Sequence, residues 1–330
     1  MNILVTGGSG YIGSALVEHL LRQGHEIRVF ETQIFGNPIA HLAGPKCEFI
    51  EGDIRDYKMV RGAMGRSDAV VHLAGVVTDE LVDMNEDFSA DVNVGGTENI
   101  VRACEYHNIS RMVYASSSSV YGTAAEEGVP TESDTPKPKT AYAMQKLKGE
   151  EIVLAYGDST RTATAVRQAT AMGPAPRMRL DTVVNIFSKQ AYFDGLITPY
   201  GGDQYRSNVY IQDVARFYEL LCMVEGKKVN RRPWNLTDEN QRVREIATRV
   251  MHAAQDLKMR AEIETVDIAD DRSYRLDGSA VERELGFQTD TGIYAAALHN
   301  FAFFKKTNLD PTDPIYNNNK RMGPLVRGEK

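Results

Sequence analysis

Two side chains that could move a proton stand four residues apart in the segment TAYAMQK, residues 140–146. On a helix, this spacing places Tyr142 and Lys146 on the same face. An ammonium group close to a phenol stabilises the phenolate, so a tyrosine whose ordinary pKa is about 10 can act as a base near neutral pH. The pair therefore predicts proton transfer at this point of the chain.

A run of four serines lies in the segment YASSSSVYG, residues 114–122, where a predicted strand ends. Ligands of open parallel sheets bind beyond the carboxyl ends of the strands. We therefore interpret the run as the rim of a site, and not as a flexible low-complexity joint. Ser118 and Ser119 are expected to line a substrate pocket, and Ser116 is expected to point elsewhere because strand neighbours alternate.

A glycine-rich loop occurs in VTGGSGYIG, residues 5–13, between a predicted strand and a predicted helix. Gly7, Gly10 and Gly13 would let the backbone turn tightly and approach a pyrophosphate, which the free N–H groups of the helix N-terminus attract. Glu31 ends the next predicted strand, 18 residues after Gly13. A carboxylate there accepts hydrogen bonds from the adenosine ribose and repels a 2′-phosphate, so the pattern favours NAD over NADP.

Short apolar strands alternate with helical patterns in the first half of the chain, which predicts a parallel sheet covered on both faces. The expected fold is α/β, a Rossmann-type doubly wound sheet with a smaller mixed α/β domain. The expected strands are residues 2–6, 26–30, 47–51, 69–74, 111–116 and 162–169, with helices over 11–24, 90–107 and from about 140.

The chain is expected to divide into three parts. Residues 1–170 would form the NAD-binding domain, with parts of 205–235 returning to it, and residues 171–305 would bind substrate. Residues 306–330 are polar, with prolines and an asparagine run, and predict a mobile tail or a lid over a neighbouring molecule.

The composition is that of an ordinary globular protein, with 330 residues, 42% hydrophobic residues and a net charge of -7. No basic run supports binding to nucleic acid or an anionic membrane. No apolar stretch suits a membrane span or a signal peptide, so we expect a cytoplasmic protein. Cys47, Cys104 and Cys222 are far apart and odd in number, which indicates reduced core thiols and neither a metal site nor a disulfide framework.

Several motifs occur together in one order, and their residues carry a family resemblance. They are VTGGSGYIG, GDIRD (52–56), HLAG (72–75), NVGGTENI (93–100), SSSSVYG, AYAMQK and YRSNVYIQDVA (205–215). Over roughly residues 1–290, the sequence resembles the extended short-chain dehydrogenase/reductases, specifically the NAD-dependent nucleotide-sugar epimerases and dehydratases, with UDP-glucose 4-epimerase as a type.

The resemblance implies a catalytic set of three residues. Tyr142 would move the proton at the reacting sugar hydroxyl, and Lys146 would bond the nicotinamide ribose and lower the pKa of Tyr142. Ser117, five residues before the glycine of VYG, would donate to the same oxygen. The implied NAD-binding residues are Gly7, Gly10, Tyr11, Ile12, Gly13, Glu31, Asp53, Ile54, Leu73, Ala74, Gly75, Asn93, Ala115, Tyr142, Lys146 and Gln168.

The substrate half departs from the family pattern. Thr170 stands where many relatives carry an asparagine that binds the sugar diphosphate, whereas Arg206 matches the arginine that grips it. Arg177 and Arg179 could add positive charge, and Arg272 or Arg275 could replace a displaced family arginine. The implied substrate-binding residues are Ser118, Ser119, Thr170, Arg179, Asn185, Arg206 and Arg272.

The reaction is read from the two positions after Ser117. The family's 4,6-dehydratases carry an Asp-Glu pair there, the glucuronate decarboxylases a Glu and the 3,5-epimerising members a Cys, where this chain has Ser118 and Ser119. Epimerisation at C4 needs no further acid or base and is the leading expectation. A 4-keto reductase, a 4,6-dehydratase and a non-catalytic NAD-binding relative stay open as alternatives. A steroid- or flavonoid-type reductase is disfavoured by Glu31 and Arg206.

A nucleotide-sugar substrate linked to UDP, dTDP, GDP or CDP is the expected partner. The resemblance also implies a homodimer formed through the helix at 90–107 and the helix that carries Tyr142. Both expected helices have apolar residues beyond one core stripe, namely Ile100, Val101, Met144, Leu147, Ile152 and Val153.

Overall fold

The computed structural model describes residues 1–122, 128–268 and 273–329. Its main feature is a sheet of seven parallel strands in the order β10-β6-β5-β4-β1-β2-β3. The strands are β1 (Asn2–Thr6), β2 (Glu26–Glu31), β3 (Cys47–Glu51), β4 (Ala69–His72), β5 (Arg111–Ala115), β6 (Thr162–Gln168) and β10 (Arg232–Leu236). The predicted α/β Rossmann-type fold is thereby confirmed.

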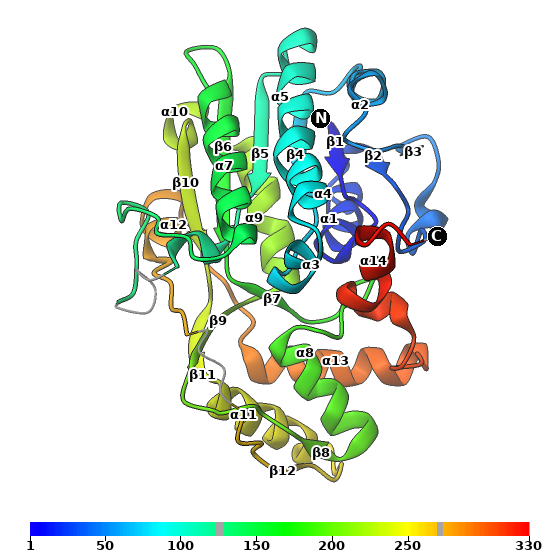
Figure 1. The fold of residues 1–330 in the computed structure, drawn as a ribbon, viewed down its shortest axis with the longest axis vertical. Helices are drawn as coiled ribbons and strands as arrows, with labels where there is room; N and C mark the ends of the chain where they lie inside the picture. The colour runs from blue at the N-terminus through cyan, green and yellow to red at the C-terminus, as the bar shows by residue number, and fades with distance from the viewer. Residues whose placement is uncertain (123–127, 269–272, 330) are drawn as a thin grey trace.

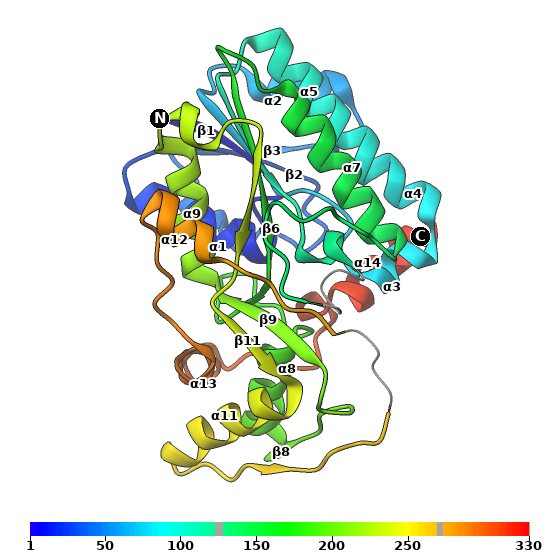
Figure 2. The same cartoon turned by 90° about the vertical axis from the view of Figure 1, so that its left-hand side faces the viewer.

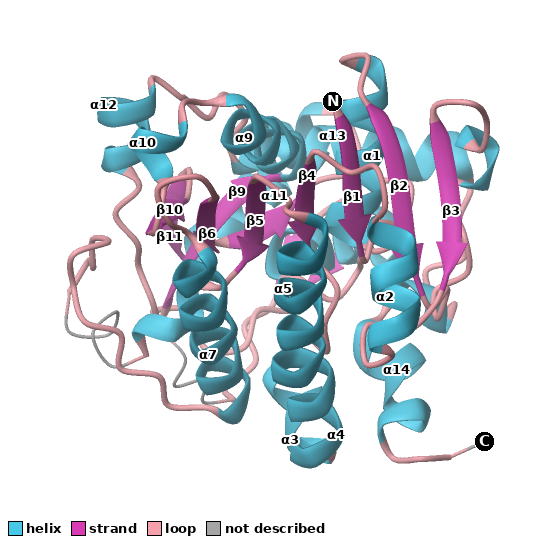
Figure 3. Cartoon of the chain, turned by 90° about the horizontal axis from the view of Figure 1, so that it is seen from above, coloured by secondary structure: helices cyan, strands magenta, loops and turns pink. Residues whose placement is uncertain are grey.

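Helices cover both faces of this sheet (Figure 3). Those on one face are α1 (Tyr11–Arg22) and α9 (Ile211–Met223), and those on the other are α2 (Tyr57–Met64), α5 (Gly96–His107) and α7 (Ala141–Tyr156). A strand buried on both sides needs an almost continuous apolar sequence, and all four residues of β4 are buried.

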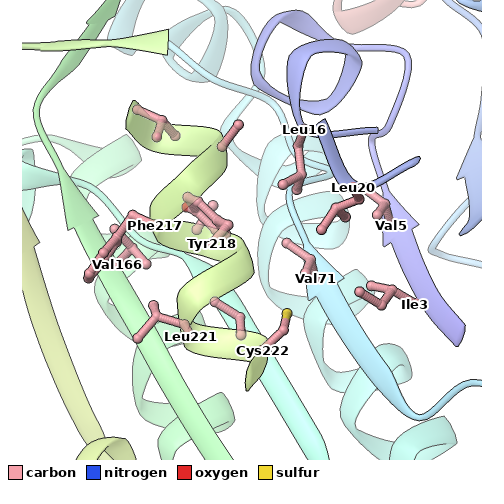
Figure 4. Close-up of a cluster of buried hydrophobic side chains, with 14 of the residues drawn as sticks. Ile3, Val5, Leu16, Leu20, Val71, Val166, Phe217, Tyr218, Leu221 and Cys222 are labelled. Atoms are coloured by element: carbon pink, nitrogen blue, oxygen red, sulfur yellow. The ribbon is translucent and has the colours of Figure 1, made fainter. Parts of the chain in front are cut away.

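The core between the sheet and its first helical layer is shown in Figure 4. Phe217 and Leu221 of α9 lie beside Val166 of β6, and Leu16 of α1 belongs to the same cluster as Val71. All five side chains are fully buried. This packing fixes the carboxyl ends of the central strands, where the functional side chains lie.

The remaining elements form the loops above the sheet and the smaller domain. The helices are α3 (Asp79–Met84), α4 (Glu86–Ala90), α8 (Val183–Lys189), α10 (Gly226–Val229), α11 (Val243–Asp256), α12 (Ser279–Leu285), α13 (Ile293–Thr307) and α14 (Asn318–Val326). The 3₁₀ turns are η1 (Ala40–Leu42), η3 (Ser118–Tyr121) and η5 (Pro314–Tyr316), and the π turns are η2 (Asp91–Gly95) and η4 (Gln190–Asp194). The short strands are β7 (Thr170–Met172), β8 (Leu196–Ile197), β9 (Tyr205–Tyr210), β11 (Glu239–Arg242) and β12 (Glu262–Ile263).

The smaller domain lies beyond the carboxyl ends of the main strands (Figure 2). It contains a three-stranded sheet, β11-β9-β7, and a pair, β12-β8, packed against α8, α11 and α13. After β9 the chain returns to the large sheet, where α9 covers one face and β10 pairs with β6. The domain limits at residues 170 and 305 stay predictions.

The C-terminal segment differs from its prediction. Helix α14 packs on α3 of the same chain, so this part of the segment is a folded element and not a mobile extension (Figure 1). A lid over a neighbouring molecule stays a prediction. Met322 and Val326 are buried against Val76, Leu81 and Val82. The apolar residues at positions 322, 325 and 326 have helical spacing, a signal that the polar composition of the tail obscured.

The predicted dimer helices bury part of the apolar set assigned to an interface. Ile100 and Val153 are fully buried in the core of the subunit, whereas the Met144 side chain is exposed. The homodimer stays a prediction. No helix in the described part of the chain is long and apolar enough to cross a membrane.

Candidate active site

The glycine loop between β1 and α1 is shaped to approach a ligand. Gly7 has φ +72°, and a Cβ there would lie 2.7 Å from the backbone nitrogen of Ala74. A Cβ at Gly13 would collide with the carbonyl of Gly7. Helix α1 begins at Tyr11 without a side-chain cap, so its N-terminal N–H groups are available to a phosphate. The loop therefore fits the pyrophosphate of a dinucleotide.

A cavity of about 440 Å³ extends from this loop along the edge of the sheet. The predicted NAD-binding residues that line it are Gly7, Gly10, Tyr11, Ile12, Gly13, Glu31, Asp53, Ile54, Leu73, Ala74, Gly75, Ala115, Tyr142, Lys146 and Gln168. Asn93 does not line the cavity. Its buried amide bonds both backbone groups of Val76 and the side chain of Gln145, so it holds the loop after β4 in place.

Two acidic side chains mark the far end of this cavity. Burial raises the pKa of Glu31, and its Oε1 accepts a 2.9 Å hydrogen bond from the backbone of Thr32. Burial acts against ionisation of Asp53 as well, but hydrogen bonds from Arg55 hold the pKa of Asp53 below its usual value. Glu31 is thus placed to accept a ribose hydroxyl, while the carboxylate of Asp53 is already paired with Arg55.

The three predicted catalytic residues come together where β5 ends. Thr140 caps α7, its hydroxyl accepting from the backbone of Ala143, and the helix then presents Tyr142 and Lys146 on one face. The Ser117 hydroxyl is a hydrogen-bond partner of Tyr142. The ammonium of Lys146 donates to the carbonyl of Ala115 over 2.9 Å. This arrangement places one phenol and one hydroxyl at a single point.

Burial is the dominant electrostatic influence on this set. It raises the pKa of Tyr142 to about 12, against lowering by the Ser117 hydrogen bond and by Arg179. Lys146 is not among the leading causes, so its lowering of the Tyr142 pKa stays a prediction. Burial also lowers the pKa of Lys146 to about 8. At neutral pH, Tyr142 is therefore a phenol and Lys146 is an ammonium. Burial of that ammonium lowers the stability of the folded protein.

The buried charge of Lys146 predicts a pH-dependent stability difference. Because its pKa falls from 10.5 to about 8 on folding, the folded state binds fewer protons between these values, and stability rises with pH there. Below pH 8, the buried ammonium of Lys146 lowers the free energy of unfolding by about 3 kcal/mol. We expect cofactor-free Lys146→Met protein to unfold in urea with a higher free energy than the unmodified protein at pH 7, and the difference to disappear by about pH 10.5. A pH-independent difference would contradict this cause.

The first serine of the run has a structural partner. The Ser116 hydroxyl donates to the carboxylate of Glu150 over 2.6 Å, and Glu150 pairs with Arg167 over 2.6 Å. All three residues are buried. Ser116 thus connects the end of β5 to α7 and β6, while Ser119 donates to the Ser117 hydroxyl over 2.8 Å.

A second cavity of about 560 Å³ adjoins the first, and Tyr142 lines both. The predicted residues that line it are Ser117, Ser118, Ser119, Thr170, Arg179 and Arg206. Thr170 is 3.3 Å from the hydroxyl of Tyr274, and the Arg206 guanidinium lies 5.1 Å from the same ring. Arg272 lies outside the described residues. The cavity therefore has the positive and hydroxyl groups that a sugar diphosphate would use.

Asn185 does not line either cavity, which corrects its predicted contact with substrate. Its side chain is fully buried and bonds the hydroxyl of Tyr11, the backbone nitrogen of Gly173 and the side chain of Asn300. A polar residue early in a helix can face either a ligand or the core. Here the Asn185 side chain faces the core, where it donates to the hydroxyl of Tyr11.

Sequence reasoning missed an acidic residue in the second cavity. Asp79 lines it together with Tyr142, and one of its carboxylate oxygens is buried without a hydrogen-bond partner among the described residues. The preceding residue, Thr78, has φ +94° and ψ 142°, a conformation that is strained for a β-branched residue. The turn at Thr78 directs Asp79 into the cavity. A single distorted turn leaves no recognisable sequence motif, so the sequence did not indicate this residue.

The fold and the site define a dinucleotide-binding protein of the Rossmann type, with a second cavity that adjoins the first. The family "NAD dependent epimerase/dehydratase family" matches residues 3–236, and the chain belongs to this family. NAD is its cofactor, as the glycine loop and Glu31 predicted.

Individual relatives include both reaction types. The chain is similar to a dTDP-glucose 4,6-dehydratase of Actinoplanes sp., with 28% identity over 92% of this chain and 98% of the relative. It is also similar to the solved UDP-glucose 4-epimerase of Thermus thermophilus in complex with NAD. That match has a TM-score of 0.78 and 26% identity, and covers 93% of this chain and all of the other. A Sinorhizobium fredii protein is 40% identical to this chain over a matched segment. That segment covers 45% of this chain and only 35% of the relative.

Proposed function

We propose that the protein is an NAD-dependent nucleotide-sugar 4-epimerase. The observation that carries the proposal is the position of the Ser117–Tyr142 pair, where the NAD cavity meets a pocket that contains Arg179 and Arg206. The positions after Ser117 bear hydroxyls, and no acid stands there to support an elimination.

The residues suit removal and return of one proton at one sugar oxygen. NAD, when bound, accepts and returns the hydride at the attached carbon. Because Tyr142 is a phenol in the cofactor-free protein, it would first lose its own proton, which the positive charges of Lys146 and of bound NAD favour. The phenolate oxygen would then take the sugar hydroxyl proton as the C–H bond breaks and give it back on reduction. Ser117 donates to the same oxygen, and Arg206 suits the diphosphate. Rotation of the keto sugar between the two half-reactions would present its other face.

A 4,6-dehydratase is a second candidate, and Asp79 favours it. Loss of water across C5 and C6 requires a base for the C5 proton and an acid for the C6 hydroxyl. An unpartnered carboxylate oxygen beside Tyr142 is a group that could serve one of these steps. An epimerase would use the same carboxylate only to hold a sugar hydroxyl.

One experiment separates these reactions. The holoenzyme is incubated in D₂O with UDP-glucose, UDP-glucuronic acid, dTDP-glucose and their GDP- and CDP-linked counterparts, without added NADH, and the products are followed by NMR. We expect a C4 epimer that keeps all carbon-bound hydrogens and contains no deuterium. A 4-keto-6-deoxy sugar with deuterium at C5 would establish the dehydratase.

Three further outcomes would distinguish an epimerase from a reductase, a dehydratase or an inactive protein. In a parallel sample that contains a 4-keto nucleotide sugar and added NADH, turnover only with stoichiometric NADH consumption would replace the epimerase by a reductase. Asp79→Asn should leave epimerisation largely intact, whereas a dehydratase that needs this carboxylate would stop after oxidation. Absence of any product from the whole panel, with NAD bound, would reject the proposal.

A further inference from the structure

The loop after β7 places a buried cation in the wall of the NAD cavity. The backbone N–H of Arg177 donates to the hydroxyl of Ser14 over 3.1 Å, in the first turn of α1. The Arg177 side chain is 3% exposed and lines the same cavity as Gly10 and Glu31. The Arg177 backbone is therefore attached to the first turn of α1, and its side chain lines the same cavity as the glycine loop that suits a pyrophosphate.

The Arg177 guanidinium is buried without a salt-bridge partner among the described residues. In the part of the chain that the structure describes, no carboxylate lies within salt-bridge distance of Arg177, and its Nε is buried without a hydrogen-bond partner. Its Nη2 donates only to neutral oxygens, at 3.1 Å from the Ile315 carbonyl and 2.7 Å from the Asn318 side chain. Burial, and then repulsion by Arg179, lowers the pKa of Arg177 to about 9, although more distant attraction by Asp181 and Glu31 acts in the opposite direction. A buried unpaired charge is costly, so an anion would complete this site.

The two neutral oxygens both belong to the C-terminal segment. The backbone N–H of Asn318, at the start of α14, donates to Asp181 over 2.8 Å. Further along the helix, Asn319 accepts from the Thr78 hydroxyl, Arg321 donates to the Ile34 carbonyl, and the Val326 carbonyl accepts from Asn85. These bonds attach α14 to loops on both sides of the NAD cavity.

Helix α14 also supplies part of the cavity wall. Asn318, Met322 and Leu325 line the cavity opposite the glycine loop, and the ring of Phe35 lies 3.8 Å from the Arg177 guanidinium. Residues near opposite ends of the chain therefore line the same cavity.

We propose that Arg177 and α14 form a second half of the dinucleotide site, in which Arg177 pairs with the pyrophosphate of NAD and α14 closes over the bound molecule. NAD would then leave only when α14 detaches. The proposal rests on the cofactor and holds for an epimerase or a dehydratase alike. Both reactions need the same NAD molecule to stay bound through two half-reactions.

The charge is tested through the rate at which NAD leaves the holoenzyme, measured without any sugar substrate by chase with a fluorescent NAD analogue. We expect Arg177→Met to release NAD about 10- to 100-fold faster, because it removes a charge-assisted contact. Arg177→Lys, which keeps the charge, should restore most of the retention. Arg22→Met, an exposed change in the last turn of α1, is the control and should have no effect.

The helix is tested by Met322→Ser and by a chain that ends at Leu309. Both should release NAD at least tenfold faster, while the melting temperature of the cofactor-free protein reports whether each variant folds. Unchanged NAD release from folded Arg177→Met, or equal release from its Met and Lys variants, would overturn the pairing with pyrophosphate. A folded truncated chain that retains NAD as firmly as the full chain would overturn the closing role of α14.

Discussion

Replacing Tyr142 by Phe is expected to lower turnover of the nucleotide sugar by 10²- to 10⁴-fold, the usual contribution of a positioned acid–base group. The phenol oxygen is the atom proposed to take and return the substrate proton, and Phe keeps the ring that lines both cavities. Initial rates of product formation by NMR, with NAD content determined in the same samples, would measure the effect.

The matched control for this change is Tyr106→Phe, which also removes one phenol oxygen. Tyr106 is 61% exposed on α5 and lines neither cavity, so its variant should turn over at the normal rate. If Tyr142→Phe retains more than a tenth of the activity while holding its NAD, another group transfers the proton, and Asp79 becomes the first residue to test.

Replacing Glu150 by Gln is expected to lower the free energy of unfolding by about 3–5 kcal/mol, because it leaves a buried arginine without its counter-charge. Glu150 and Arg167 have side chains only 3% and 5% exposed, and the carboxylate also accepts from Ser116. Urea unfolding followed by circular dichroism would measure the loss, in cofactor-free protein so that NAD binding does not mask it.

The neighbouring residue provides the control. Glu151 pairs with Lys148 on the exposed side of the same helix, and such pairs contribute less than about 1 kcal/mol. Glu151→Gln should therefore change stability little. The double variant Glu150→Leu/Arg167→Met should recover much of the loss, since an apolar pair can replace a buried ion pair. Equal effects of the Glu150 and Glu151 changes would show that the buried pair has no special role.

The parts of the site that sequence reasoning located are those whose residue types have few physical alternatives. Gly7 and Gly13 occupy positions where a side chain would meet backbone, and Lys146 lies four residues after Tyr142 on a helix. Glycine spacing and helical period record such constraints directly. The same holds for the main sheet, because β4 and its neighbours must be apolar on both faces.

The parts that sequence reasoning missed depend on tertiary contacts between distant segments. Asn185 turned out to bond the phenol of Tyr11, 174 positions away, and Arg177 meets Asn318 across 141 positions. Tyr142 has a raised pKa because the surrounding protein desolvates its partly buried phenol, which the spacing to Lys146 cannot indicate. Each of these depends on which surfaces meet, and local pattern carries no record of it.

The return of the chain to the large sheet bears on how the protein is made. Strand β10 pairs with β6, and α9 covers the neighbouring face, yet both follow the first strands of the smaller domain in sequence. On the ribosome, the apolar face around Val166 therefore stays open until α9 ends at residue 223, and the edge of β6 until β10 ends at residue 236. Open strand edges attract other chains. The NAD-binding half is thus a discontinuous folding unit, and a fragment cut at residue 170 would emerge with one edge unprotected.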